Sequence, residues 1–442
     1  MDLLKDKIGS LYLKFLAPSL FSALVTTIYS FVDTIAIGKG VGTDGTAACA
    51  VIYPIMGVAS LFGFLCGIGG SVRFGKARGE GRMEKANAYY TASLILVLVL
   101  TALVWPFTAL FRKEIFTLFG ASSALMPLVL EYGDWIIGTF PAFILSAYFT
   151  CMVRCVGAAL EILGAVIAGG VFNVFGDWFL VFPMGMGMAG AAIATAGGTV
   201  IQLFVLCAYL FSQKSSLTLV RPWKLTKAFF KSVTAGFSAS VLEFAFIILT
   251  CILNNQIMRY GGETALAVFG VVLTCSGMFQ HIFTGVGQTI QPIATTNFGA
   301  GQIRRIASLR RISELTVIAM GIVFMLSGIL FPAQIICFFM DATPEVLSAA
   351  PGIMRIYFIS FLFMGINIWA TFYFQSILRT RTSTVLSLLR GLILSGLLLY
   401  LLPAWLGLDG VWWAMVLTEG IVAAVTLACV FVTNRTLQHR LL

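Results

Sequence analysis

Hydrophobic runs of about 20 residues follow one another along nearly the whole of this 442-residue chain. A run of that length, wound as an α-helix, crosses the roughly 30 Å hydrocarbon core of a bilayer. Charged residues make up only 10% of the sequence, too few for the surface of a soluble domain of this size. We therefore expect an all-α integral membrane protein with about 12 transmembrane helices. The runs are centred near Thr26, Gly57, Val99, Pro141, Ala168, Val200, Leu249, Gly285, Val323, Ile366, Leu394 and Val422.

Little of the chain is left over between these runs. There is no room for a nucleotide-binding domain, and the phosphate-loop pattern G-x-x-x-x-G-K-S/T is absent. The nine cysteines are scattered, and Cys151 and Cys155, one helical turn apart, have no His or second Cys pair beside them. We expect a protein that is not an enzyme, with no cofactor and no metal beyond a coupling ion.

The net charge of +10 is distributed unevenly between the predicted spans. If the N-terminus is cytoplasmic, most Lys and Arg face the cytoplasm, as the positive-inside rule requires. We therefore expect cytoplasmic N- and C-termini, a multi-pass protein of the inner or plasma membrane, and no nucleic-acid partner. The cytoplasmic residues are Lys5, Lys7, Lys14, Arg73, Lys76, Arg78, Arg82, Lys85, Arg154, Lys214, Arg221, Lys224, Lys227, Lys231, Arg304, Arg305, Arg310, Arg311, Arg379, Arg381, Arg435 and Arg440, against Lys39, Arg112, Lys113, Arg259 and Arg355 outside.

The chain also repeats weakly at about half its length, which predicts two lobes of six helices each. We place an N-lobe at residues 1–211, a cytoplasmic linker at 212–231 and a C-lobe at 232–442. Six is even, so both lobes enter the membrane from the same side and are related by an axis along its normal. Three segments recur in order at offsets of about 220 to 225 residues: Tyr148–Arg154 as Tyr373–Arg379, Phe74-Gly75 as Phe298-Gly299, and Met186–Gly190 as Leu406–Gly410.

Four carboxylates, Asp33, Asp177, Glu243 and Glu419, lie inside predicted spans. A charge at the bilayer centre costs roughly 2.5–3.5 kcal/mol even on lenient scales, so such residues usually mark an ion or substrate pathway. Asn173 precedes Asp177 by four residues, which places both on one helix face. Their oxygens can bind a small cation, and an Asp can instead bind a proton. The alternative is that water reaches Asp33 near the outer interface and that Asp177 is bonded locally.

Five segments of the chain together form a recognisable pattern: Asp33-Thr34-x-x-x-Gly38, Phe74-Gly75-Lys-Ala-Arg-Gly, Asn173-x-x-x-Asp177, Gly187-x-x-Gly190-Ala-Ala-Ile-Ala-Thr195 and Gly407-Leu-Asp-Gly410-Val-Trp412. They resemble the MATE (multidrug and toxic compound extrusion) family, and within it the bacterial branch that includes the staphylococcal multidrug exporter. The resemblance implies twelve helices in two lobes and export of cationic or amphipathic compounds against inward flow of H+ or Na+. It also implies a cation-coupling site at Asp33, Asn173, Asp177 and Thr195, with Tyr132 lining the pocket.

One position departs from the family pattern. Many members have Pro after the acid of the fifth helix, where this chain has Trp178. We therefore expect a straighter and bulkier helix at the site, which bears on substrate range more than on ion coupling.

The second lobe offers a less complete set of candidates. We expect Glu243, Gln288, Tyr357 and Asn367 to line the substrate cavity together with Tyr132, with Tyr357 offset by 225 residues from Tyr132. Span 10 carries no acid, and we assign Glu419 a structural role.

These observations predict a monomeric secondary active antiporter that works by rocking between inward- and outward-open states. The alternative is a lipid-linked saccharide flippase, which would need a basic cavity to hold a pyrophosphate. Arg390 is the one base placed deep in a span, and the acids outnumber it. A channel is a third reading, which the repeat disfavours.

Overall fold

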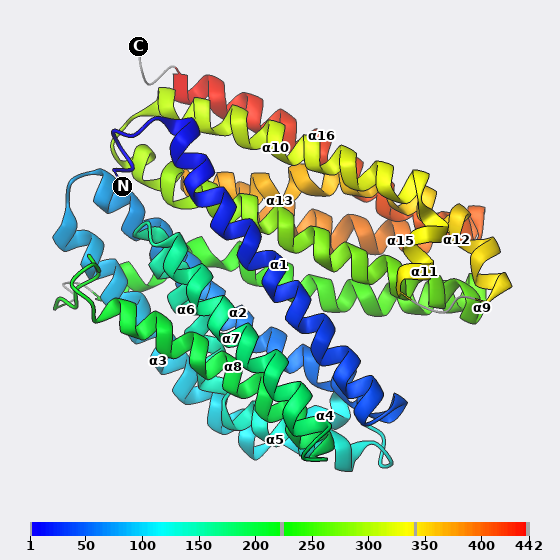
Figure 1. Ribbon diagram of the computed structural model, residues 1–442. Coiled ribbons are helices and arrows are strands. Elements are labelled where there is room, and N and C mark those ends of the chain that lie inside the picture. The colour runs from blue at the N-terminus through cyan, green and yellow to red at the C-terminus, as the bar shows by residue number, and fades with distance from the viewer. Residues whose placement is uncertain (1, 222–224, 340–342, 439–442) are drawn as a thin grey trace. The chain divides into compact units, whose positions relative to one another are not determined.

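The structure is a computed structural model that describes residues 2–221, 225–339 and 343–438. Side chains are described there except at residues 43, 225–232, 234–235, 238–244, 246–247, 263 and 438. Within these residues all regular elements are helices (Figure 1). The hydrophobic runs form helices because backbone N–H and C=O groups in hydrocarbon must bond within their own segment.

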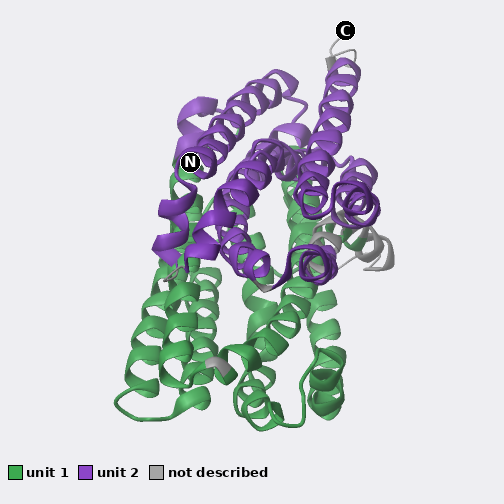
Figure 2. Cartoon of the chain, turned by 90° about the vertical axis from the view of Figure 1, so that its right-hand side faces the viewer, with its two compact units in different colours: residues 1–4, 14–243 green, residues 5–13, 244–442 purple. Residues whose placement is uncertain are grey.

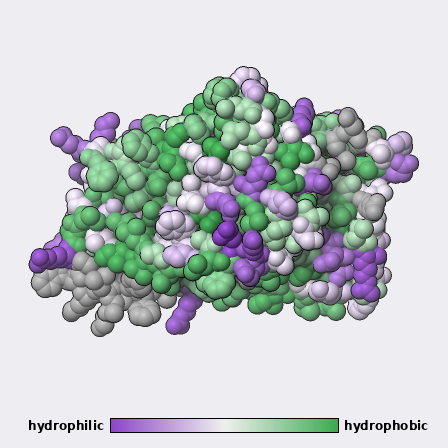
Figure 3. All heavy atoms as spheres, turned by 90° about the horizontal axis from the view of Figure 1, so that it is seen from below, coloured by the Kyte–Doolittle hydropathy of each residue, from purple (hydrophilic) through white to green (hydrophobic). Residues whose placement is uncertain are grey.

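Among the described residues, nine helices are long and apolar enough to cross a membrane, or up to eleven if each of two bent helix pairs counts as one span. The run predicted near Leu249 falls in the first part of α9, where many side chains are not described. The expected all-α membrane fold is confirmed, and Figure 3 agrees with it, because hydrophobic side chains cover most of the face that the view shows.

The chain forms two compact units, coloured separately in Figure 2. Unit 1 comprises Met1–Leu4 and Lys14–Glu243, and unit 2 comprises Lys5–Leu13 and Phe244–Leu442. The first turns of α1 thus belong to unit 2, where the Arg305 guanidinium donates to the Asp6 carbonyl at 2.7 Å.

The helices of unit 1 are α1 (Ile8–Gly40, from Lys14 on), α2 (Thr43–Gly79), α3 (Met83–Leu110), α4 (Arg112–Leu118), α5 (Met126–Gly138), α6 (Phe140–Cys155), α7 (Ala159–Gly176), the π-helix η1 (Asp177–Val181), α8 (Gly187–Leu210) and the start of α9 (Leu225–Gly299). Those of unit 2 are the rest of α9, α10 (Ile303–Leu330), α11 (Pro332–Phe339), α12 (Pro344–Tyr357), α13 (Ser360–Ser376), α14 (Thr380–Leu388), the π-helix η2 (Leu389–Ile393), α15 (Leu394–Leu406) and α16 (Leu408–Gln438).

The order of elements in unit 1 recurs in unit 2. Two long helices are followed by one of 28 residues, a short helix, a bent pair, a helix that runs into a π-turn and a long final helix. The bends are similar, 51° between α5 and α6 and 42° between α12 and α13. The helix α9, which is broken at Gly262, supplies the first two members of the second series.

Within unit 1, part of the predicted linker is bonded to α3. The Asn87 amide donates to the Thr218 hydroxyl at 2.7 Å, and the backbone N–H of Val220 donates to Thr91 at 3.1 Å. This stretch therefore packs on the side of α3.

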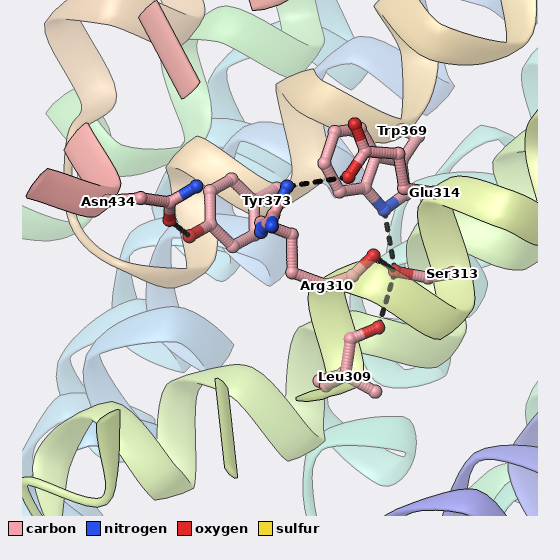
Figure 4. A network of polar contacts seen from close by, with 7 residues as sticks. All are labelled: Leu309, Arg310, Ser313, Glu314, Trp369, Tyr373 and Asn434. Carbon is pink, nitrogen blue, oxygen red and sulfur yellow. Dashed lines mark hydrogen bonds and ion pairs between the residues drawn. The ribbon is translucent and has the colours of Figure 1, made fainter. Parts of the chain in front are cut away.

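Within unit 2, a polar network joins α10, α13 and α16 (Figure 4). The Trp369 indole donates to the Ser313 hydroxyl at 2.8 Å, and Tyr373 donates to the Asn434 side chain at 3.2 Å. Arg310 pairs with Glu314 one turn along α10 at 2.6 Å. These bonds satisfy polar groups at a buried helix junction, so we regard this network as structural.

The helices α7 and α8 lie side by side and cross at two glycines. A Cβ atom on Gly169 would lie 2.6 Å from the Gly198 carbonyl oxygen, and one on Gly198 would lie 2.7 Å from that of Gly169. Small residues of this kind let membrane helices approach backbone to backbone. The crossing fixes the spacing of two side chains one turn further along, Asn173 on α7 and Thr195 on α8.

Candidate functional site

A buried polar cluster lies inside unit 1. It takes Asp33 from α1, Asn173 from α7, Asp177 from η1, Thr195 from α8 and Tyr132 from α5. The structure thus places the four predicted coupling residues and the predicted pocket tyrosine in one neighbourhood. What they do there is taken up below as a proposal.

The Thr195 hydroxyl is the centre of this cluster. It donates to Oδ1 of Asp33 at 3.1 Å and accepts from Nδ2 of Asn173 at 3.2 Å. The Tyr132 hydroxyl lies 3.4 Å away and donates to the same oxygen. A hydroxyl has one proton and two lone pairs, so these three bonds use its full capacity.

Three oxygens of the cluster have no hydrogen-bond partner among the described residues. They are both carboxyl oxygens of Asp177, which is fully buried, and Oδ1 of Asn173. The Asp33 and Asp177 carboxyls are also close enough to interact electrostatically. A buried acceptor without a partner costs roughly 1–3 kcal/mol. A proton or a small cation that prefers oxygen ligands would satisfy these atoms.

Asp177 lies where the backbone changes from an α-helix to a π-turn. The α-helix α7 ends at Gly176, and the chain continues as a π-turn from Asp177 to Val181. A π-turn inserts one residue into a helical turn and is frequent at functional sites. The stretch without the proline thus contains a π-turn, and Ala159–Val181 together form one candidate membrane span.

The side chain of Trp178, which we expected to add bulk at the site, does not point into the cluster. The side chain of Trp178 is 57% exposed and packs against Phe175 and Phe179, with ring centroids 6.0 and 6.4 Å away. The indole therefore adds apolar surface on the outside of η1, and the position of the Asp177 carboxyl does not depend on it.

Two residues of α2 near the acids were not singled out from the sequence. Cys49 and Tyr53 both interact electrostatically with Asp33 and Asp177, and the Tyr53 hydroxyl bonds to Thr34. Their spacing of four residues places them on one face of α2, and this spacing is the signal that would have identified them.

The four candidates of the second lobe lie in different surroundings. Asn367 on α13 is buried, and its amide donates to Oε2 of Glu419 at 2.7 Å. Tyr357 is buried at the end of α12, bonds to Ser276 and interacts electrostatically with Glu419. Gln288 lies partly buried on α9, whereas the side chain of Glu243 is outside the described residues.

The chain is similar to known proteins along nearly its whole length. A family model described as MatE matches residues 18–179 and 237–401. The multidrug export protein MepA of Staphylococcus saprophyticus is 24% identical over 423 residues, which are 94% of this chain and 92% of that protein. MepA of Staphylococcus aureus strain NCTC 8325 is 22% identical over 432 residues, 97% of this chain and 94% of that protein.

The fold itself matches solved structures. A crystal structure of MATE in complex with MaL6 superposes with a TM-score of 0.92 at 20% sequence identity, covering 99% of this chain and 98% of that one. This likeness establishes the fold.

Proposed function

The chain belongs to the MatE family, and from that premise we propose that it is a secondary active multidrug antiporter of the cell membrane. It exports cationic or amphipathic compounds in exchange for H+ or Na+. The names of its relatives, multidrug export proteins, support small-molecule drugs as the cargo. The apolar helices that make it a multi-pass membrane protein hold the proposed coupling site.

The observation that carries this proposal is the set of cluster oxygens that have no partner among the described residues. In the part of the chain that the structure describes, Asp177 and Asn173 hold three buried acceptors without donors, and Asp177 interacts electrostatically with the carboxyl of Asp33. An ion that enters and leaves such a site changes the charge and the hydrogen bonding of α1, η1 and α8 together. That change is the kind of local event that favours one conformation over another.

Coupling requires the ion and the drug to oppose each other. A proton or Na+ on Asp33 and Asp177 cancels negative charge that would otherwise attract a cationic drug. Each ligand must then weaken the other's binding by the same factor, because coupling free energy is reciprocal. We propose that two lobes rock to expose the site on alternate sides, and the recurring order of elements supports such a pair.

The test is drug efflux from everted vesicles with a pH gradient and a Na+ gradient imposed separately. Asp177→Asn keeps the shape of the side chain and removes its charge, so we expect it to abolish efflux driven by the coupling ion. Asp134→Asn is the matched control, because Asp134 is 53% exposed and pairs with Arg112 away from the cluster. Normal gradient-driven efflux by Asp177→Asn would refute the coupling assignment.

A flippase would need a cavity lined by basic residues whose charge no acid neutralises, and no observation favours this alternative. Arg390, the deep base on which it depended, forms an ion pair with Glu419 at 2.7 Å.

A further inference from the structure

A buried polar cluster in unit 2 lies on elements that correspond to those of the unit 1 cluster. Arg390 is in the π-turn η2, as Asp177 is in the π-turn η1. Glu419 lies on α16, the final helix of its series, as Thr195 lies on α8. Tyr357 is on the first helix of a bent pair and interacts electrostatically with both Arg390 and Glu419. Corresponding elements therefore carry the polar groups of the two clusters.

The two clusters differ in their charge. Unit 1 holds two carboxyls, Asp33 and Asp177, and neither forms an ion pair among the described residues. In unit 2, Nε of Arg390 lies 2.7 Å from Oε1 of Glu419. Both of these side chains are largely buried, with exposed fractions of 13% and 3%. The cluster of unit 2 thus contains a cation of its own.

The clusters also differ in how their oxygens are satisfied. In unit 1, both carboxyl oxygens of Asp177 and Oδ1 of Asn173 lack a donor among the described residues. In unit 2, Oε1 of Glu419 accepts from the guanidinium and Oε2 accepts from Nδ2 of Asn367 at 2.7 Å. Oδ1 of Asn367 in turn accepts from Thr426 at 3.3 Å. The oxygens of unit 2 are therefore satisfied without an added ion.

The guanidinium of Arg390 differs from a coupling ion in one respect, because it is covalently attached and stays protonated in proteins. It cannot leave Glu419 for the solution on either side of the membrane. Stability alone does not account for the pair, since desolvation offsets most of the attraction between buried charges. Charged residues within spans instead mark functional positions by default.

We infer that the Arg390 guanidinium takes the place of a coupling ion in unit 2, so that exchangeable ions bind in unit 1 alone. Arg390 is then a residue that sets how many ions are exchanged for each drug molecule. A protein with unpartnered carboxyl oxygens in both units would load an additional ion in each transport cycle. The inference rests on the proposed function, because it assumes that the unit 1 cluster binds the coupling ion.

The first measurement removes the carboxyls of unit 1 and leaves unit 2 unchanged. Asp33→Asn/Asp177→Asn, called the neutral background, replaces both carboxyls with amides of the same shape. Binding of radioactive Na+ to the purified protein and potentiometric titration of protons count the ions that each variant takes up relative to the wild type. We expect the neutral background to lose the ion uptake of the wild type. Adding Glu419→Gln should change its uptake no further, because the guanidinium already neutralises that carboxylate.

The second measurement removes the guanidinium in the neutral background. Arg390→Ala should restore the uptake of about one ion per molecule, because one freed carboxylate can bind one proton or one Na+. Its melting temperature should rise with the concentration of that ion, since a ligand that binds the folded state stabilises it. Arg390→Ala/Glu419→Gln should show no such uptake, and neither should Arg390→Lys, which keeps a positive charge beside the carboxylate. Arg381→Ala, at an exposed arginine of α14, controls for the loss of a basic residue.

Ion uptake by the neutral background that Glu419→Gln removes would overturn the inference, because unit 2 would then bind an exchangeable ion despite Arg390. Folded Arg390→Ala protein that gains no ion would overturn it as well. Because the first measurement does not alter Arg390, it decides the inference even if Arg390→Ala does not fold. If the wild type and the neutral background take up the same number of ions, the proposed coupling site in unit 1 is itself wrong.

Discussion

The hydroxyl of Thr195 donates to Oδ1 of Asp33 across 3.1 Å, joining α8 to α1 between residues 162 positions apart in the sequence. The hydroxyl oxygen of Thr195 also accepts hydrogen bonds from Asn173 of α7 and Tyr132 of α5. One hydroxyl therefore connects four helices of unit 1. An ion that binds at Asp33 must compete with or rearrange this hydrogen bond, so its effect reaches all four.

Thr195→Val should weaken ion binding at the cluster. Val keeps the shape of the side chain but leaves Asp33 without its donor and Asn173 without its acceptor, at about 1–3 kcal/mol for each unsatisfied group. We expect at least about a tenfold higher ion concentration for half-maximal efflux. Vesicle efflux assays at varied ion concentration measure this. Thr195→Ser, which keeps the hydroxyl, should stay near wild type, and an equal defect in both variants would contradict the role given to the hydroxyl.

Gly198→Ala should destabilise the protein and impair transport. The added methyl would meet the Gly169 carbonyl, and relief by backbone displacement costs about 1–3 kcal/mol. A lower melting temperature of the detergent-solubilised protein is the readout. Gly164→Ala is the control on α7, because a Cβ there meets nothing within 4 Å. Similar melting temperatures for the two variants would mean that α7 and α8 can separate freely.

Arg390→Gln alone should be less stable than Arg390→Gln combined with Glu419→Gln. The single change leaves the Glu419 charge buried without its partner, which costs about 3–5 kcal/mol, whereas the double change removes both charges. Thermal unfolding of wild type, both single variants and the double variant completes a double-mutant cycle. Additive effects of the two single changes would show that the ion pair contributes no coupling energy.

Saturating the coupling ion should raise the dissociation constant of a cationic drug. The same drug at saturation should raise the dissociation constant of the ion by an equal factor, about 5- to 150-fold for typical coupling energies. Equilibrium binding to the purified protein, with H+ and Na+ varied separately, measures both factors. The ion that shows no such reciprocity is not the coupling ion, and Asp177→Asn should abolish the effect of the one that does.

The sequence predicts the membrane helices well because hydrophobic runs depend on local composition alone. It also places Asp33, Asn173, Asp177 and Thr195 on candidate spans, and the MATE resemblance, which the family match confirms, joins them in one site. The partner of Glu419 could not be predicted in this way. Arg390 precedes it by 29 residues on a different helix, and no periodicity relates the two.

The π-turn at Asp177 likewise could not be predicted from the sequence. Whether a helix inserts a residue depends on how its neighbours pack, and the sequence around Trp178 does not show it. The addition of Lys5–Leu13 to unit 2 is a similar case, since it depends on tertiary contacts such as that of Arg305 with Asp6.

The crossing of Gly169 and Gly198 has a bearing on which ion the protein can use. A proton needs a single oxygen and is indifferent to how far apart the others stand. A metal ion needs several oxygens at matched distances, and the separation of α7 from α8 sets the distance between Asn173 and its neighbours. Gly169 and Gly198 set this separation, and a methyl group added at Gly198 would meet the Gly169 carbonyl and lie 3.3 Å from Cβ of Asn173. We therefore expect such a change to impair the binding of a metal ion more than that of a proton.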